Sequence, residues 1–89
     1  MSAQAKLLSP PENFAVVQLP ERKYPGVVFQ GDALAGLVQQ VGRMRAQLSA
    51  KDLEQLAEEL DALGEELREV KEHYETVCRA HEISLPYPA

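Results

Sequence analysis

One apolar repeat between Ser49 and His81 constrains this chain more than any other feature. Its large apolar residues recur at alternating steps of three and four: Leu53, Leu56, Leu60, Leu63, Leu67, Val70, Tyr74 and Val77. This spacing places them along one face of an α-helix. An apolar face needs a partner surface in water. The repeat therefore predicts a long helix over residues 50–81 that packs on the rest of the chain or on another protein.

A shorter repeat with the same spacing precedes the long one. Its residues are Leu34, Leu37, Val41, Met44 and Leu48, and Val38 broadens the stripe. Gly31 and Asp32 come just before it, and aspartate at the N-cap accepts hydrogen bonds from the first free amides of a helix. The repeat predicts a first helix over residues 33–48, with Asp32 as its N-cap.

Two signals predict a break between these helices, although neither glycine nor proline separates them. Ser49 with Asp52 three residues later resembles a capping box, with aspartate in place of the usual Glu or Gln. In addition, five residues separate Leu48 from Leu53, where a continuous stripe has steps of three or four. We therefore expect an antiparallel helical hairpin rather than one continuous helix.

The N-terminal third predicts two strands. Residues 14–19 and 27–30 are short apolar stretches, and the loop between them contains Pro20, Pro25 and Gly26. They predict an antiparallel β-hairpin over residues 14–30, packed on the helices because a two-stranded ribbon alone is marginal. Residues 1–13 are expected to form an extended arm, and residues 82–89 a tail that folds back or extends. The predicted fold is α+β, a single small domain over residues 1–89.

Composition narrows the class of protein. The chain has 89 residues and a single cysteine, so burial is limited and an intramolecular disulfide is impossible. Self-association as a homodimer is therefore expected. No apolar run approaches the ~20 residues of a membrane span, and the first thirty residues lack the pattern of a secretion signal. These features favour a cytoplasmic protein that does not contact membranes.

Negative charge is concentrated in the long predicted helix. The formal net charge is −5, and residues 51–75 contain ten acidic side chains against three basic ones. Six carboxylates follow one side of the helix and form what we call the acidic ridge: Glu54, Glu58, Asp61, Glu65, Glu69 and Glu72. This charge disfavours binding to nucleic acid, which depends on Lys and Arg. It is suited to steering a basic partner protein.

Residue types that carry chemistry are few. His73, Cys78 and His81 lie on one helix, and at 100° per residue His73 points about 140° away from Cys78, so the three cannot converge on one zinc ion. Cys78 is expected to be a small buried packing residue, and His81 a partly buried histidine at the helix end, where its cation suits the helix dipole. Neighbouring carboxylates on a polar helix face lack the environments that separate the pKa values of an acid and a base. No catalytic residue, metal ligand or cofactor site is predicted.

Two glycines lie inside the predicted helices, where glycine costs up to about 1 kcal/mol relative to alanine. Gly64, with Ala57 and Cys78, lies on the flank of the long apolar stripe, and Gly42 lies in the first helix. Small residues permit close approach of another element, so a close packing contact is expected at both glycines. A local kink at Gly64 is the alternative.

The most distinctive local string is Tyr24-Pro25-Gly26-Val27-Val28-Phe29-Gln30-Gly31-Asp32. It resembles a segment found in a group of short, uncharacterised bacterial proteins, in which an aromatic-Pro-Gly turn, an apolar strand and a Gln-Gly-Asp helix start follow one another. The resemblance covers about residues 16–38. It implies a bacterial source and no known activity.

These features together favour non-enzymatic protein binding, in which the acidic helix or the edge of the β-hairpin engages another protein. One concrete form is a small acidic bacterial inhibitor or immunity-type protein, whose acidic ridge engages a basic toxin or enzyme. The alternative is a structural or regulatory homodimer that uses the long helix as an assembly element. The residues expected in a dimer or helix contact are Leu60, Leu63, Leu67, Val70, Tyr74 and Val77. An enzyme comes third, because no motif with a mechanism is present.

Overall fold

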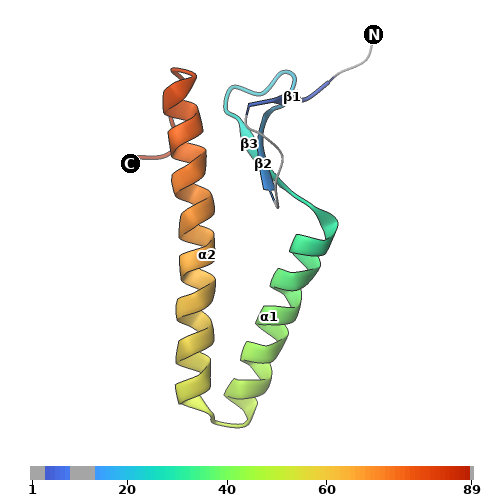
Figure 1. Ribbon diagram of the computed structural model, residues 1–89, viewed down its shortest axis with the longest axis vertical. Helices are drawn as coiled ribbons and strands as arrows, with labels where there is room; N and C mark the ends of the chain where they lie inside the picture. Colours follow the sequence, from blue (N-terminus) through green and yellow to red (C-terminus); the bar gives the residue numbers. More distant parts are fainter. Residues whose placement is uncertain (1–3, 9–13, 89) are drawn as a thin grey trace.

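The structure, a computed structural model, describes residues 4–8 and 14–88. It contains strands β1 (Lys6–Leu7), β2 (Phe14–Gln18) and β3 (Gly26–Phe29), followed by helices α1 (Gly31–Ser49) and α2 (Leu53–Ala80). The three strands form a small sheet beside the C-terminal half of α2, and α1 runs back alongside the N-terminal half (Figure 1). The predicted α+β class, with a β-hairpin, a helical hairpin and one long helix, is confirmed.

The sheet is antiparallel throughout, in the order β1-β2-β3. β2 and β3 form the predicted hairpin, with Phe14 opposite Phe29 and Val16 opposite Val27. β1 pairs with the other edge of β2, with Lys6 opposite Gln18. The predicted arm therefore contributes a third strand. This strand could not be predicted, because it has two residues and no alternating apolar pattern. The rest of the predicted arm, residues 1–3 and 9–13, lies outside the described residues.

The core lies between the central strand and the last turns of α2. Val16 is fully buried and packs with Tyr74, Val77 and Cys78. The predicted role of Cys78 as a small buried packing residue is confirmed. Partly buried apolar residues surround this cluster: Leu8, Val27, Ile83, Leu85 and Tyr87.

The first helix begins earlier than predicted. α1 starts at Gly31, and its N-cap is Gln30, whose backbone is extended and whose side chain makes no capping bond. The Leu34 amide donates to the Gln30 carbonyl at 2.9 Å, so regular helical bonding already begins there. Asp32 lies in the first turn, where its carboxylate accepts from the Ala33 amide at 2.8 Å. The prediction of Asp32 as the N-cap is wrong, although its charge still suits the N-terminal dipole.

The break between the helices is confirmed, but it lies later than predicted. Ser49 is the last residue of α1 rather than the cap of α2. Lys51 adopts a left-handed conformation with φ of 59°, and the Asp52 amide donates to the Gln47 carbonyl at 2.9 Å. This is a Schellman ending built without glycine. Asp52 then caps α2, since its side chain accepts from the Gln55 amide at 3.2 Å. The predicted capping box at Ser49 is therefore wrong.

Helix α2 also ends in a Schellman motif without glycine. Glu82 has φ of 56°, and the Ile83 amide donates to the Cys78 carbonyl at 2.8 Å. This turn reverses the chain, so the C-terminal tail runs back beside α2 (Figure 1). This outcome is one of the two predicted for the tail. His81 caps the helix and is exposed, with Nε2 3.3 Å from the Leu8 carbonyl oxygen, so its predicted partial burial is wrong.

The helical hairpin is only loosely closed. α1 and α2 approach each other near their connecting turn and diverge toward the sheet (Figure 1). The radius of gyration is 16.3 Å, whereas a compact domain of this length has a value of about 12 Å. A Cβ atom at Gly42 or Gly64 would have no neighbour from another element within 4 Å, so the predicted close contacts at these glycines are absent from the described chain. Much of the surface that the sequence marks as apolar therefore faces outward.

Candidate functional site

The helical hairpin leaves one set of large aliphatic residues uncovered. Seven side chains from the two helices are between 45% and 65% exposed. They are Leu34, Val38, Val41, Leu48, Leu53, Leu60 and Leu67, and we call this set the apolar face. Isolated exposed leucines are normal on a protein surface, whereas a contiguous apolar patch marks an interaction site. These seven side chains form an interaction site of this kind only if they are contiguous.

Helical geometry places them on one side of the hairpin. The less exposed residues of α1 include Leu37, Gln40 and Met44, and those of α2 include Leu63 and Val70. At 100° per residue, the exposed stripe lies about 90° from these residues, in the same rotational sense on each helix. Because the two helices are antiparallel, equal rotations carry both stripes to the same side. The two stripes of the apolar face therefore lie on the same side of the hairpin, close together near the connecting turn and further apart toward the sheet, where the helices diverge (Figure 1).

An ion pair fixes how the two stripes align. Arg43 Nε lies 3.2 Å from Glu59 Oε1, which places these two residues at similar heights along the hairpin. Counting from this pair in opposite directions along antiparallel helices brings Leu48 level with Leu53 to within one residue, or about 1.5 Å. Val41 is then level with Leu60, and Leu34 with Leu67. The apolar face thus consists of three cross-helix layers.

The apolar face continues into a groove beside the sheet. Six apolar or aromatic residues and the stem of Lys71 line this groove of about 330 Å³: Val27, Phe29, Leu67, Val70, Tyr74 and Tyr87. Leu67 belongs both to the groove and to the uppermost layer of the apolar face. A second hollow, of about 610 Å³, lies between α1 and α2 and has a mixed lining that includes Gln40, Arg43 and Glu66. The groove is the more apolar of the two.

The residues predicted for a dimer or helix contact fall into three groups. Tyr74 and Val77 are buried beneath the sheet. Leu63 and Val70 are half-buried, while Leu60 and Leu67 are exposed. The sheet therefore covers the C-terminal part of the predicted stripe, which forms the core, and leaves the N-terminal part accessible to a partner.

The α1 half of the apolar face was not among the predicted site residues. Leu34, Val41 and Leu48 were assigned to the helix stripe, and their exposure was not foreseen. The signal was present in the sequence, since these residues occupy every seventh position, as Leu53, Leu60 and Leu67 do. One neighbouring helix cannot cover the full width of such a broad apolar stripe, so one edge of the stripe stays exposed.

The acidic ridge is exposed along its whole length. All six carboxylates, from Glu54 to Glu72, lie on the surface of α2. Within the described chain, Glu65 is the only ridge member in an ion pair, with Arg68 Nη1 2.8 Å from Glu65 Oε1. Such an exposed pair is worth only a few tenths of a kcal/mol. The ridge therefore keeps most of its negative charge, and it is centred more than 90° around α2 from the apolar face.

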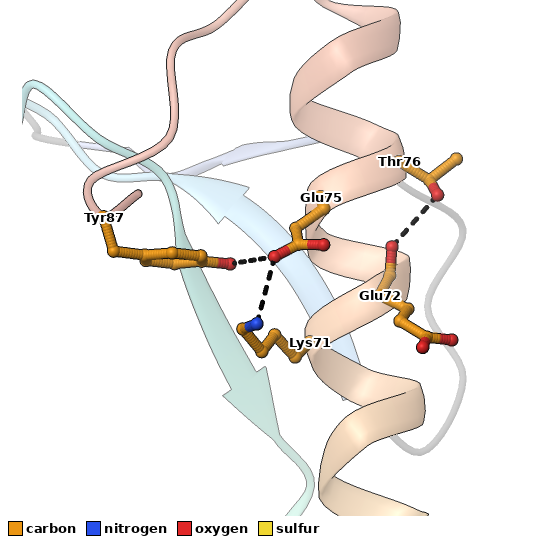
Figure 2. Close-up of polar contacts among 5 residues, drawn as sticks. All are labelled: Lys71, Glu72, Glu75, Thr76 and Tyr87. Carbon is orange, nitrogen blue, oxygen red and sulfur yellow. Dashed lines mark hydrogen bonds and ion pairs between the residues drawn. The ribbon is translucent and has the colours of Figure 1, made fainter. Parts of the chain in front are cut away.

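A polar cluster on α2 anchors the tail (Figure 2). The Tyr87 hydroxyl donates to Glu75 Oε2 at 3.0 Å, and Lys71 Nζ lies 3.4 Å from the same oxygen. Lys71 Nζ also lies 5.2 Å from the centre of the Tyr87 ring. Burial, followed by the bond to Glu75, raises the pKa of Tyr87. Sequence analysis missed this cluster, because its members come together only when the tail folds back.

Tyr74 connects the core to the β-hairpin. Its hydroxyl donates to the Pro25 carbonyl at 2.7 Å across 49 residues of chain. Burial, and secondarily the nearby Cys78, raises the pKa of Tyr74 to about 12. The ring is 6% exposed, so ionisation would place a charge in the core.

This shift predicts a loss of stability in alkali. Below pH 10 both folded and unfolded chains keep the Tyr74 proton, whereas between pH 10 and about 12 only the folded chain does. The free energy of unfolding should therefore fall through this window, by about 1–3 kcal/mol. Urea titrations from pH 8 to 12 measure the effect. Tyr74→Phe has no such group, and an equally large fall in that variant would refute the assignment to Tyr74.

The three residues considered as metal ligands have other surroundings. The His73 ring packs edge-on against Phe14 with centroids 5.3 Å apart, and Cys78 is in the core. No three His, Cys, Asp or Glu side chains within residues 4–8 and 14–88 are grouped to hold a metal ion. In the same ranges, neither helix combines the length and apolar character needed to cross a membrane. The distinctive surfaces are thus the apolar face with its groove, and the acidic ridge.

Comparison with known proteins identifies a family for this chain. No curated protein and no solved structure matches the chain significantly. A family of unknown function (DUF6959) matches residues 1–87, which is nearly the whole sequence. This agrees with the predicted resemblance to an uncharacterised group of proteins, and the family carries no assigned activity. The chain belongs to this family of unknown function, DUF6959.

Proposed function

We propose that this chain is a non-enzymatic protein-interaction module whose working surface is the apolar face of its helical hairpin. The observation that carries the proposal is the exposure of seven large aliphatic side chains, each 45% to 65% exposed, on one side of two helices. Exposed apolar area of this kind is unfavourable in water unless another surface covers it.

The form of the surface favours a helical partner. Its three layers are spaced by seven residues, the period with which one helix presents side chains to another. The groove at Leu67 and Phe29 extends the surface toward the sheet and offers a seat for an additional apolar side chain. A helix or helical hairpin of matching period is the natural complement. A cytoplasmic, bacterial setting is part of this proposal and rests on the sequence features described above.

The acidic ridge supports a second candidate function. Its six exposed carboxylates, five of them without an ion pair among the described residues, favour a basic protein partner. In this case the chain would act as a small inhibitor or immunity-type protein. The ridge and the apolar face are centred on different sides of α2.

Affinity capture from the cells that produce the chain tests the function with one matched pair of variants. Leu60→Glu places a charge in the middle layer of the apolar face. Val28→Glu makes the same change at a residue that is equally exposed, at 50%, on the sheet. We expect the captured partner to be lost with Leu60→Glu and retained with Val28→Glu.

Salt separates the two candidate surfaces. Binding through the ridge should weaken as salt rises from about 50 to 500 mM, because exposed charges are screened. It should be unaffected by Leu60→Glu, because Leu60 lies outside the ridge. Binding through the apolar face should persist in salt. A partner retained by Leu60→Glu under all conditions would refute the apolar face as the working surface.

A further inference from the structure

We infer that a second copy of this chain covers the apolar face, in a two-fold dimer in which α1 of each copy lies against α2 of the other. The inference rests on the proposed function, because it names the partner of the same surface. The assembly is a four-helix bundle whose two helix-connecting turns lie at the same end. Four observations support this arrangement: molecular dimensions, layer heights, small residues and charge.

The dimensions of the single chain call for further burial. Its accessible surface is 6792 Å², whereas a compact monomer of 9.9 kDa exposes about 5,200 Å². The difference exceeds the ~800 Å² that each partner contributes to a standard protein interface. Together with the radius of gyration of 16.3 Å, this surplus is large enough for an interface of ordinary size.

The heights of the three layers match in the dimer. A two-fold axis parallel to the helices leaves every residue at its own height along the bundle. Since Leu48, Val41 and Leu34 are already level with Leu53, Leu60 and Leu67 in one chain, they meet the same leucines of the second copy. Each layer then contains four aliphatic side chains, as in the core of a four-helix bundle, and the closest contact lies near the turns, where α1 and α2 approach each other (Figure 1). A partner with unrelated spacing would not match all three layers.

Small residues lie where the second copy needs space. Ala57 and Gly64 flank the apolar stripe on the side of α2 that faces away from α1. By the same height rule, Gly64 is level with Val38 of the second copy, which is 64% exposed in the single chain. Ala57 is level with Arg45. A Cβ atom at Gly64 would have no neighbour from another element within 4 Å in the single chain, so the dimer provides the contact that its own fold lacks.

Charge selects between the two possible two-fold arrangements. Helix α1 has one acidic and two basic residues, a net charge of +1, while α2 has nine acidic and three basic residues, a net charge of −6. Placing α1 on α2 brings opposite charges together. The reversed arrangement, with turns at opposite ends, places α2 on α2 and opposes like charges. In the favoured arrangement, Arg45 of one copy points toward Glu54 and Asp61 of the other.

Mass in solution by light scattering tests the dimer on the full chain. We expect twice the chain mass of 9.9 kDa, both in low and in high salt. Leu60→Glu should raise the dimer dissociation constant by about a hundredfold or more, because it removes a layer contact in each copy. Val28→Glu should leave it unchanged. Circular dichroism checks the fold of both variants, and Leu60 is half exposed in the single chain, so its substitution disturbs little within one copy.

A charge exchange tests the orientation independently of the apolar layers. Arg45→Glu should weaken the dimer about threefold to thirtyfold in low salt, since it replaces an attraction with a repulsion in both copies. Adding Asp61→Arg should restore most of the loss. If Arg45→Glu leaves the dimer unchanged or tightens it, the α1-on-α2 arrangement is wrong.

The outcomes also separate this inference from the proposed function. A chain that stays monomeric to about 100 μM overturns the dimer. If that monomer captures a protein that Leu60→Glu loses and Val28→Glu retains, the apolar face serves a different partner and the proposed function stands. If Leu60→Glu changes neither mass nor capture, both the dimer and the proposed function are refuted.

Discussion

Tyr74→Ala should reduce the free energy of unfolding by about 3–5 kcal/mol, the range found for removing a large aromatic side chain from a core. Tyr74 is 6% exposed and belongs to a cluster with only three other buried members, Val16, Val77 and Cys78, among the described residues. A chain of this length has a total stability of about 4–13 kcal/mol. The variant should therefore be partly or wholly unfolded at 37 °C, as measured by urea and thermal unfolding.

Tyr74→Phe is the matched control for this prediction. It keeps the ring in the core but removes the hydroxyl that donates to the Pro25 carbonyl at 2.7 Å. Losing this bond leaves a buried carbonyl without its partner, at a cost of about 1–3 kcal/mol. Tyr74→Ala should thus be clearly less stable than Tyr74→Phe. Equal stability of the two variants would mean that the ring contributes little and that the core lies elsewhere.

Ending the chain after Ile83 should cost about 2–3 kcal/mol of stability. The truncation keeps the amide of Ile83 that donates to the Cys78 carbonyl at 2.8 Å, so the helix ending is preserved. It removes Leu85 and Tyr87, two partly buried residues packed against the core, and the hydrogen bond from Tyr87 to Glu75. Apolar burial and a hydrogen bond to a charged group together give this magnitude, reduced by the entropy that the tail regains.

Point variants identify which part of the tail contributes. Tyr87→Phe removes only the hydroxyl and should cost about 1 kcal/mol, while Leu85→Ala tests the apolar contact alone. Chemical denaturation monitored by circular dichroism measures all three variants in the same buffer. A truncated chain as stable as the full chain would show that the tail lies on the core without stabilising it.

Both predictions concern the same part of the molecule, the sheet end of α2. There the tail, the β-hairpin and the last turns of the helix supply the described core. The other end has a different character, since α1 and α2 meet through Arg43, Glu59 and half-buried aliphatic residues. The fold is therefore supported at one end, and the surface proposed for binding lies mainly along the less covered remainder.

Local sequence signals located the elements with small errors at their ends. The predicted helices 33–48 and 50–81 correspond to Gly31–Ser49 and Leu53–Ala80. The errors arose from capping, because Asp32 and Ser49 are good cap residues by type but do not occupy the cap positions. Lys51 and Glu82 adopt left-handed conformations that glycine usually supplies, so the two Schellman endings could not be predicted from residue type.

Non-local contacts account for what could not be predicted. Strand β1 is two residues long and exists because β2 offers a free edge. The cluster of Tyr87, Glu75 and Lys71 forms because the turn at Glu82 sends the tail back along α2. In both cases the residues have no periodic pattern, and each contact joins parts of the chain that are separate in sequence.

The sequence by itself determined the α+β class, the helical hairpin, the strand pair and the concentration of negative charge on α2, because periodicity, turn residues and charge are local properties. Only the tertiary structure decided how the long apolar stripe is divided. The sheet and tail cover Tyr74 and Val77, while Leu60 and Leu67 remain exposed together with the matching stripe of α1. The physical reason is size: one short helix and three short strands cannot cover both apolar stripes along their full width, and the uncovered part is where we place the partner.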